Sequence, residues 1–312
     1  MTERPILAVV DPKSAPAVIA AARRQAERRG LGLQVLGVIE APRNLRAAAK
    51  AAGLSPDALI DRLTGALKRD IEAALPGDLD VPVTVRCGKA FIEIILCAVE
   101  VHAALVIKAP DPFTGAAMRL FASTDQHLLR KCPCPVWLVP EGGAPHVRTV
   151  VAAVDVDPEA AEPDTLADVN ARVMEAARTV CEPDGEIHLV HAWQAEDQGL
   201  FWAFGGDGEQ ASQAYADAVK TGRRRALDAF AAGYPQGEPG PRVIKRLMRG
   251  PAHEVIAEAA RRVRADVLVM GTVARTGLRG VIIGNTAENI LNAAAGSVIA
   301  VKPSSFVTPI LP

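Results

Sequence analysis

One stretch in the second half of the chain combines residue types that bind phosphate. Glycines at 271, 277 and 284 would let backbone N–H groups approach an anion closely. Arg275 and Arg279 could donate charge-assisted hydrogen bonds to phosphate oxygens. The spacing predicts an anion site whose candidate residues are Gly271, Thr272, Ala274, Arg275, Gly277, Arg279, Gly284, Asn285 and Thr286.

A purely structural interpretation of this stretch stays open. Glycines also permit a tight crossing from a strand to a helix. Asn285 and Glu288 have the spacing of a capping box, in which a side chain at the helix start bonds the backbone. That arrangement explains Asn285 without any ligand.

The elements around the stretch indicate where a site would lie. An apolar run at residues 266–270 is typical of a buried strand, and a helical pattern begins near Thr286. Asp155 ends another strand-like run, at residues 147–155. Ligands of open parallel sheets bind beyond the carboxyl ends of strands, where the strand order reverses. Asp155 is therefore a further candidate site residue.

The same order of elements occurs twice along the 312 residues. Short runs of Val, Ile, Leu and Ala alternate with longer helical patterns, which indicates βαβ units and parallel sheets. Asp11 matches Asp155, and Val139 matches Val301. We predict an α/β fold in two open-sheet domains with helices on both faces of each sheet. The predicted parts are a first domain at residues 1–140, a linker at 141–146 and a second domain at 147–312.

The first half lacks the features of an anion site. Lys108 is expected at the position of Gly271, and Pro110 and Pro112 follow it. Prolines have no N–H group to donate to an anion. We therefore expect no nucleotide phosphate in the first domain, and we expect Lys108 to form a structural ion pair with Asp11.

Composition excludes several classes of protein. The chain has 35 basic and 36 acidic residues, so a broad nucleic-acid surface is not expected. No apolar run is long enough to span a membrane, and the first residues lack a secretory apolar segment. Five scattered cysteines do not suggest a disulfide framework, which predicts a reducing, cytoplasmic environment.

Metal sites are weakly supported. Cys132 and Cys134 with His127 upstream could suggest a soft-metal site, but the helical spacing is poor and no fourth ligand is evident. His188 and His191 lie three apart on a strand and should point to opposite faces. No catalytic motif or pair of carboxylates for acid–base chemistry stands out. We predict no bound metal at these residues and no catalytic centre.

The motifs resemble those of universal stress proteins. The nucleotide loop of that family reads Gly-x2-Gly-x9-Gly-(Ser/Thr), and the stretch here reads Gly271-x2-Ala274-x9-Gly284-Asn285. Residues 250–252, 266–271, 123–133 and 284–288 and the tail from Lys302 also resemble the tandem, universal stress protein E-like branch. The resemblance implies two five-stranded parallel sheets of order 3-2-1-4-5, as in adenine nucleotide alpha hydrolase-like folds.

The resemblance also implies a function. A stress-response protein of this kind would bind an adenine nucleotide, ATP with Mg²⁺, in its second domain. Asp155 would lie near the base or ribose, and Gly271, Gly284, Asn285 and Thr286 would lie near the phosphates. The two domains would pack as an intramolecular pseudo-dimer through residues 136–139 and 298–301. Enzymatic activity is not expected beyond a weak ATPase at most.

An aromatic segment bounded by glycines leaves other functions open. Phe201, Trp202 and Phe204 lie in a loop where polar residues are expected. They could pack on the other domain or on a partner subunit, or they could form a lid over an apolar ligand. The alternatives to nucleotide binding are therefore a binder of an apolar or nucleotide-sugar-linked lipid metabolite and a ligand-free interaction scaffold.

Overall fold

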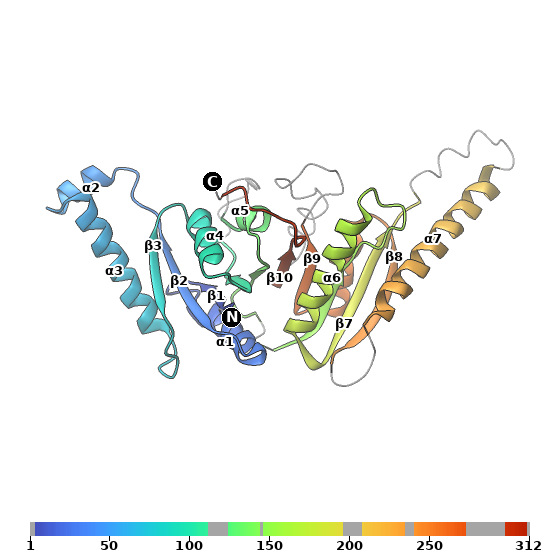
Figure 1. Ribbon diagram of the computed structural model, residues 1–312, viewed down its shortest axis with the longest axis horizontal. Helices are drawn as coiled ribbons and strands as arrows, with labels where there is room; N and C mark the ends of the chain where they lie inside the picture. The colour runs from blue at the N-terminus through green and yellow to red at the C-terminus, as the bar shows by residue number, and fades with distance from the viewer. Residues whose placement is uncertain are drawn as a thin grey trace. The chain divides into compact units, whose positions relative to one another are not determined.

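A computed structural model arranges the described residues in two compact units (Figure 1). The structure describes residues 4–111, 124–143, 146–195, 208–234, 240–272 and 297–310. The first unit extends to His146, and the second begins at Val147. Residues 305–310, near the end of the chain, belong to the first unit.

The first unit is built on a parallel sheet of strand order β3-β2-β1-β4-β5. Its strands are β1 Ile6–Val9, β2 Leu33–Ile39, β3 Val83–Cys87, β4 Leu105–Lys108 and β5 Val136–Leu138. Its helices are α1 Ala15–Arg29, α2 Leu45–Ala51, α3 Pro56–Ala74, α4 Ala90–Glu100 and α5 Thr124–Lys131. Every residue of β1 is buried, as expected for a central parallel strand covered on both faces.

The second unit repeats this architecture with the strand order β8-β7-β6-β9-β10. Its strands are β6 Val147–Ala153, β7 Cys181–Trp193, β8 Arg242–Arg249, β9 Val267–Gly271 and β10 Ser297–Val301. Its described helices are α6 Pro163–Val180, α7 Gly208–Ala232 and α8 Ala252–Val263. The predicted fold class and strand order are therefore confirmed in both units.

The connections between strands place helices on both faces of each sheet. In the first unit, α1 and α3 connect strands that step in one direction along the sheet, whereas α4 returns the chain in the opposite direction. Because parallel crossovers are right-handed, opposite steps put their helices on opposite faces. Accordingly, α1 contacts α3, and α4 contacts α5. The strand order reverses between β1 and β4, and in the second unit between β6 and β9.

Simple local features explain two of the helices. Helix α6 begins at Pro163. Proline is favourable in the first turn of a helix, where its missing N–H has no intrahelical partner to lose. Helix α2 was not expected, because its seven residues are too few to show a clear apolar period.

Backbone hydrogen bonds show which residues of the two units are equivalent. The N–H of Val10 donates to the carbonyl of Leu36 in β2, and the N–H of Val154 donates to the carbonyl of Val190 in β7, each at 3.0 Å. Each of these valines is followed by an aspartate. The predicted equivalence of Asp11 and Asp155 is therefore confirmed.

The same comparison corrects one expected match. Leu105 of β4 lies opposite Ile6 of β1, and Val267 of β9 lies opposite Val150 of β6. Ile6 and Val150 are equivalent, because each lies four residues before the matched valine, Val10 or Val154. Counting along the strands from Leu105 and Val267 makes Ala109, and not Lys108, the equivalent of Gly271. The expectation for Lys108 was wrong by one residue, because strand register is set by backbone hydrogen bonds that side-chain types do not reveal.

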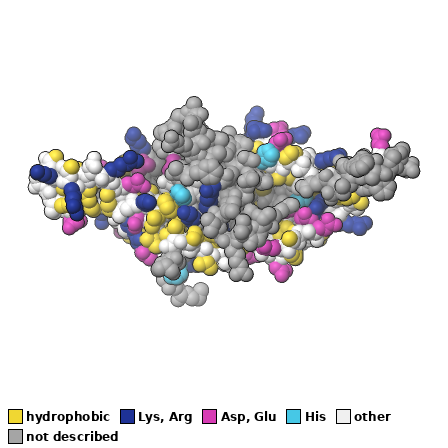
Figure 2. Space-filling model, turned by 90° about the horizontal axis from the view of Figure 1, so that it is seen from above, with side chains coloured by type: hydrophobic (Ala, Val, Ile, Leu, Met, Phe, Trp, Pro, Cys, Tyr) yellow, Lys and Arg dark blue, Asp and Glu magenta, His cyan; other side chains and the backbone are white. Residues whose placement is uncertain are grey.

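The charged surface mixes both signs. On the face seen in Figure 2, Lys and Arg side chains are interspersed with Asp and Glu side chains. In the described part of the chain, some charged side chains pair across elements, as Arg23 does with Asp78 and Arg148 with Asp184. Solvent screens exposed pairs of this kind, so they contribute little to stability. The mixture agrees with the near-equal numbers of basic and acidic residues.

Candidate functional site

The carboxyl ends of β6 and β9 lie side by side where the strand order of the second unit reverses. Ala153 of β6 lies opposite Met270 of β9. Asp155, Gly271 and Thr272 follow within two residues of this pair, so the structure brings three predicted site residues to one edge of the sheet. This edge is the described part of the candidate site.

The other predicted site residues lie outside the described part of the chain, and their roles stay predictions. They are Ala274, Arg275, Gly277, Arg279, Gly284, Asn285 and Thr286, with Phe201, Trp202 and Phe204 of the predicted lid.

Gly271 allows α6 to pack closely against β9. A Cβ atom added to Gly271 would lie 2.5 Å from Cγ1 of Val169. Valine is stiff at χ1, so a simple rotation of its side chain does not relieve this clash. Strand–helix packing, the structural interpretation that the sequence left open, therefore explains Gly271 without a ligand. The same packing holds its backbone at the candidate site.

We expect Gly271→Ala to lower the free energy of unfolding by about 1–3 kcal/mol, since the added methyl group must displace Val169. Urea denaturation followed by circular dichroism measures the loss. Adding Val169→Ala to the same chain should restore most of it. Gly222→Ala on α7 is the control, because a Cβ atom there meets open space. Equal losses for the two glycine variants would contradict the packing explanation.

Asn170 holds the backbone at Asp155. Its side-chain amide, on α6, accepts a hydrogen bond from the Asp155 N–H at 2.9 Å and donates to the Asp155 carbonyl at 2.6 Å. His191 of β7 lies nearby, with Nδ1 3.2 Å from the carbonyl of Val154 and 3.9 Å from the Asp155 carboxylate. Asn170 was not among the predicted site residues. A polar residue among the buried positions of an amphipathic helix was the available signal.

The two histidines of β7 contact different neighbours. Nδ1 of His188 accepts a hydrogen bond from Nε of Arg246 at 2.9 Å, and its Nε2 lies 3.4 Å from Glu186. Burial lowers the pKa of His188, and the charge of Arg246 lowers that pKa further. His188 and His191 therefore do not share a ligand. Within the described ranges, no three His, Cys, Asp or Glu side chains come together as metal ligands would.

The cysteines of the first unit form a close pair. Sγ of Cys132 and Sγ of Cys134 lie 3.5 Å apart, and both residues are buried. The hydrogen bond between Cys134 and Cys132, together with burial, raises the pKa of the Cys134 thiol well above its ordinary value. His127 stacks on the ring of Phe91, with 4.1 Å between ring centroids. The arrangement thus favours packing over the soft-metal interpretation of these residues.

A buried lysine lies at the same edge as the candidate site. Nζ of Lys302, the residue after β10, donates to Oγ1 of Thr272 at 2.9 Å. The Thr272 hydroxyl donates in turn to the carbonyl of Val301 at 3.4 Å. Lys302 is 3% exposed and Thr272 is 2% exposed. In the sequence, Lys302 belongs to the tail that resembles the family, and no role was predicted for it.

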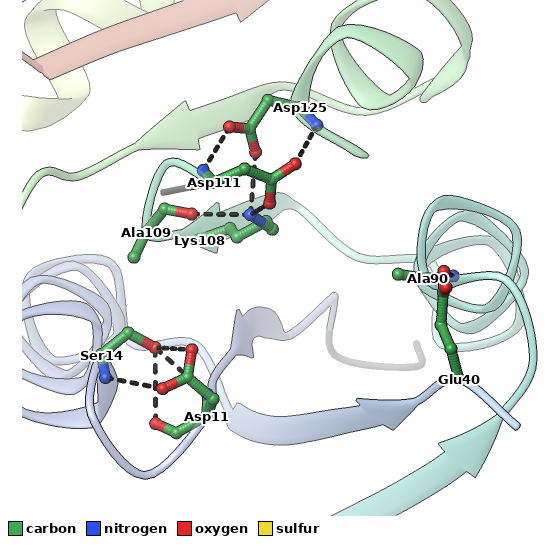
Figure 3. Close-up of polar contacts among 8 residues, drawn as sticks. All are labelled: Asp11, Ser14, Glu40, Ala90, Lys108, Ala109, Asp111 and Asp125. Carbon is green, nitrogen blue, oxygen red and sulfur yellow. Dashed lines mark hydrogen bonds and ion pairs between the residues drawn. The ribbon is translucent and has the colours of Figure 1, made fainter. Parts of the chain in front are cut away.

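At the equivalent edge of the first unit, carboxylates of the chain itself bond the N–H groups at helix starts (Figure 3). Asp11 accepts hydrogen bonds from the N–H groups of Lys13 at 2.8 Å and Ser14 at 3.0 Å, before α1. Glu40 accepts from the N–H of Ala90 at 3.1 Å, at the start of α4. Burial acts to raise the pKa of Asp11, but these hydrogen bonds outweigh it and lower that pKa.

Lys108 is also neutralised by carboxylates of the chain (Figure 3). Its Nζ lies 2.5 Å from Asp111 and 2.8 Å from Asp125, and the N–H of Asp111 donates to Asp125. The predicted pair of Lys108 with Asp11 is wrong, because the loop after β4 and helix α5 bring closer carboxylates. Burial acts to lower the pKa of Lys108, but Asp125 and Asp111 outweigh it and raise that pKa.

The comparisons with known proteins decide the family. The model of the universal stress protein family matches residues 3–140 and again residues 146–302. The chain belongs to the universal stress protein family. The two matches correspond to the two repeats, so this is a tandem universal stress protein, and its described helices include none long and apolar enough to cross a membrane.

Curated relatives point to the same branch of universal stress proteins. Universal stress protein E of Salmonella typhi is 28% identical over 242 residues, which are 77% of this chain and 73% of that protein. Universal stress protein E of Escherichia coli K12 is 28% identical over 208 residues, which are 66% of this chain and 63% of that protein. The predicted resemblance to the tandem, universal stress protein E-like branch is therefore confirmed.

Solved structures share the tandem fold. A protein of unknown function from Pseudomonas aeruginosa PAO1 has a TM-score of 0.63 and 23% identity, over 97% of this chain and 93% of that one. A universal stress protein from Archaeoglobus fulgidus has a TM-score of 0.58 and 15% identity, over 97% and 99% of the two chains. At these identities the likeness shows the fold alone.

Proposed function

We propose that this tandem universal stress protein is a non-enzymatic stress-response protein that binds an adenine nucleotide in its second unit. The meeting of Asp155, Gly271 and Thr272 where the strand order reverses carries the proposal. Open parallel sheets bind nucleotides at that point. The glycine- and arginine-containing stretch that follows Thr272 adds donors for phosphate.

The first unit supports the same proposal by contrast. At its equivalent edge, carboxylates of the chain itself bond the backbone N–H groups and Lys108. These carboxylates are Asp11, Glu40, Asp111 and Asp125. A nucleotide phosphate there would be repelled by Asp11 and Glu40, which already occupy the N–H groups at the helix starts. We therefore assign one nucleotide to the chain, with Mg²⁺ as the counter-ion of its phosphates. The pseudo-dimer through the last strands of the two domains stays a prediction.

Native mass spectrometry of the purified protein, followed by denaturation, tests the proposal by identifying any released molecule. We expect an adenine nucleotide, and we expect calorimetry to show binding of added Mg-ATP when the purified chain is empty. Gly284→Ala should abolish this binding and leave the circular dichroism spectrum unchanged, because a methyl group would block the approach of phosphate to the backbone.

Other results of this experiment contradict the proposal in different ways. Release of an acyl-bearing or nucleotide-sugar molecule would favour the apolar ligand and the aromatic segment at residues 201–204. A bare chain that also ignores Mg-ATP would favour a ligand-free scaffold. Unchanged ATP affinity in Gly284→Ala would move the phosphates away from the glycine-rich stretch.

A further inference from the structure

We infer that Arg223 of α7 is a positioning residue for the ligand of the second unit. Its ion pair with Asp157 fixes the segment at residues 154–157, which carries Asp155 beyond the end of β6. The inference rests on the proposed nucleotide site. It assigns to Arg223 a role that acts through the backbone of this segment, and it ties α7 to the candidate site.

Helix α6 and strand β7 hold the first three residues of the segment. Asn170 of α6 bonds the N–H and the carbonyl of Asp155 at 2.9 and 2.6 Å. Nδ1 of His191, on β7, lies 3.2 Å from the carbonyl oxygen of the preceding residue and 3.4 Å from the nitrogen of the following one. Those two neighbours, Val154 and Val156, are both buried. The backbone is therefore fixed as far as Val156.

Arg223 fixes the fourth residue of the segment. Its guanidinium group pairs with the carboxylate of Asp157, which also accepts a hydrogen bond from the N–H of Glu159 at 2.9 Å. The side chains of Arg223 and Asp157 are only 14% and 12% exposed, so solvent screens this pair far less than it screens the exposed pairs of the surface. The segment is thereby held from three elements, α6, β7 and α7.

The ion pair suits a positioning role better than a stabilising one. Taking two charges out of water offsets much of their attraction, so a buried ion pair is a weak source of stability. The planar guanidinium group, in contrast, imposes a defined direction on a carboxylate partner. A ligand site needs groups that their neighbours hold at fixed positions. The Asp155 side chain, two residues before Asp157, is 26% exposed, so a ligand can reach it.

The first unit has a different residue at the equivalent position. The equivalent of Asp157 is Lys13, which is exposed. A lysine has no acceptor atom and cannot pair with an arginine. Helix α1 also begins four residues after Asp11, whereas α6 begins eight residues after Asp155. The longer connection of the second unit therefore has an anchor of its own, in the unit for which a ligand is proposed.

Calorimetry of the full chain with ATP and with adenosine tests this inference. The double variant Arg223→Met and Asp157→Asn removes both charges, and the asparagine keeps an oxygen that accepts the N–H of Glu159. Both ligands should bind about 10-fold more weakly, within the range for residues that act on a site without contacting its ligand. The two losses should be equal, because the variant displaces the backbone at Asp155, and the melting temperature should change little.

A second ion pair of α7 provides the matched control. Lys245→Met with Asp228→Asn neutralises a pair between β8 and α7 and should leave both affinities unchanged. If the first double variant does not fold, Asp157→Asn alone keeps the shape of the side chain and weakens its pair with Arg223. This single variant should lower both affinities in the same direction and by a smaller factor.

The outcomes separate this inference from the proposed function. Wild-type affinities in a folded Asp157 variant would overturn the inference and leave the nucleotide site standing. A loss for ATP alone would also overturn it, since that result shows a lost charge and not a displaced backbone. If the wild type binds neither ATP nor adenosine, the proposed function fails, and hydrogen exchange of the Asp155 N–H becomes the deciding measurement. Faster exchange in the double variant than in the control variant would still support the anchor, and equal rates would overturn it.

Discussion

Asp125→Ala is expected to lower the free energy of unfolding of the first unit by about 3 kcal/mol. Removing one partner of a buried ion pair costs about 3–5 kcal/mol, because the other charge stays buried without it. The lower end applies, because Asp111 would still contact Lys108. The N–H of Asp111 would also lose its acceptor. Chemical denaturation with separate fluorescence and circular dichroism probes measures the change.

The pH dependence of this loss has a defined sign. The carboxylates raise the pKa of Lys108 above its ordinary value. A raised folded-state pKa means that the contribution of Lys108 is complete below its ordinary pKa and disappears as pH rises through the higher folded value. The difference between the wild type and Asp125→Ala should therefore shrink at strongly alkaline pH, where Lys108 loses its proton.

A transplant of the second unit's residues is the control for the charge argument. The triple variant Lys108→Met, Asp111→Val and Asp125→Ala installs the apolar residues that the sequence of the second repeat has 162 positions later, at Met270, Val273 and Ala287. Replacing a whole buried ion cluster by apolar residues is often neutral or stabilising. The triple variant should therefore be more stable than Asp125→Ala alone. If it is equally unstable, the loss comes from packing at Asp125 and not from an uncompensated charge.

The second large effect is expected from Asn170→Ala, which should lower the free energy of unfolding by about 2–4 kcal/mol. Both backbone groups of Asp155 lose their hydrogen bonds to the Asn170 amide, and the loss of a buried hydrogen-bond partner costs about 1–3 kcal/mol. The backbone at the candidate site also loses its anchor, so affinity for ATP should fall together with stability. Urea titration and calorimetry on the same preparation measure the two effects.

Thr179→Ala provides a matched comparison on the same helix. The Thr179 hydroxyl donates to the carbonyl of Glu175, one turn earlier, at a site reached by solvent. Water can replace that hydrogen bond, so the expected change in stability is within about 0.5 kcal/mol. A loss for Thr179→Ala as large as that for Asn170→Ala would show that α6 responds to any polar truncation and would contradict the anchoring role.

The first unit shows why Asn170 could not be found from the sequence. There, α1 begins four residues after Asp11, and Ser14 bonds the Asp11 N–H locally at 3.1 Å. In the second unit, α6 begins eight residues after Asp155, so no residue of the first turn follows closely enough. A residue one to two turns into the helix replaces the local cap. Such a contact depends on how α6 docks on the sheet, which local sequence patterns do not encode.

Sequence patterns by themselves determined the repeat, the strand order implied by the family resemblance, and the pairing of Asp11 with Asp155. The repeat and the pairing follow from apolar periodicity and from residue types at strand ends, which are local properties of the chain, whereas the strand order came from the resemblance alone. Only the tertiary structure decided the register that makes Met270 the equivalent of Lys108, the carboxylates that surround Lys108, and the position of Lys302 beside Thr272. Those contacts join residues far apart in the chain, and they depend on backbone register and helix docking that no single segment specifies.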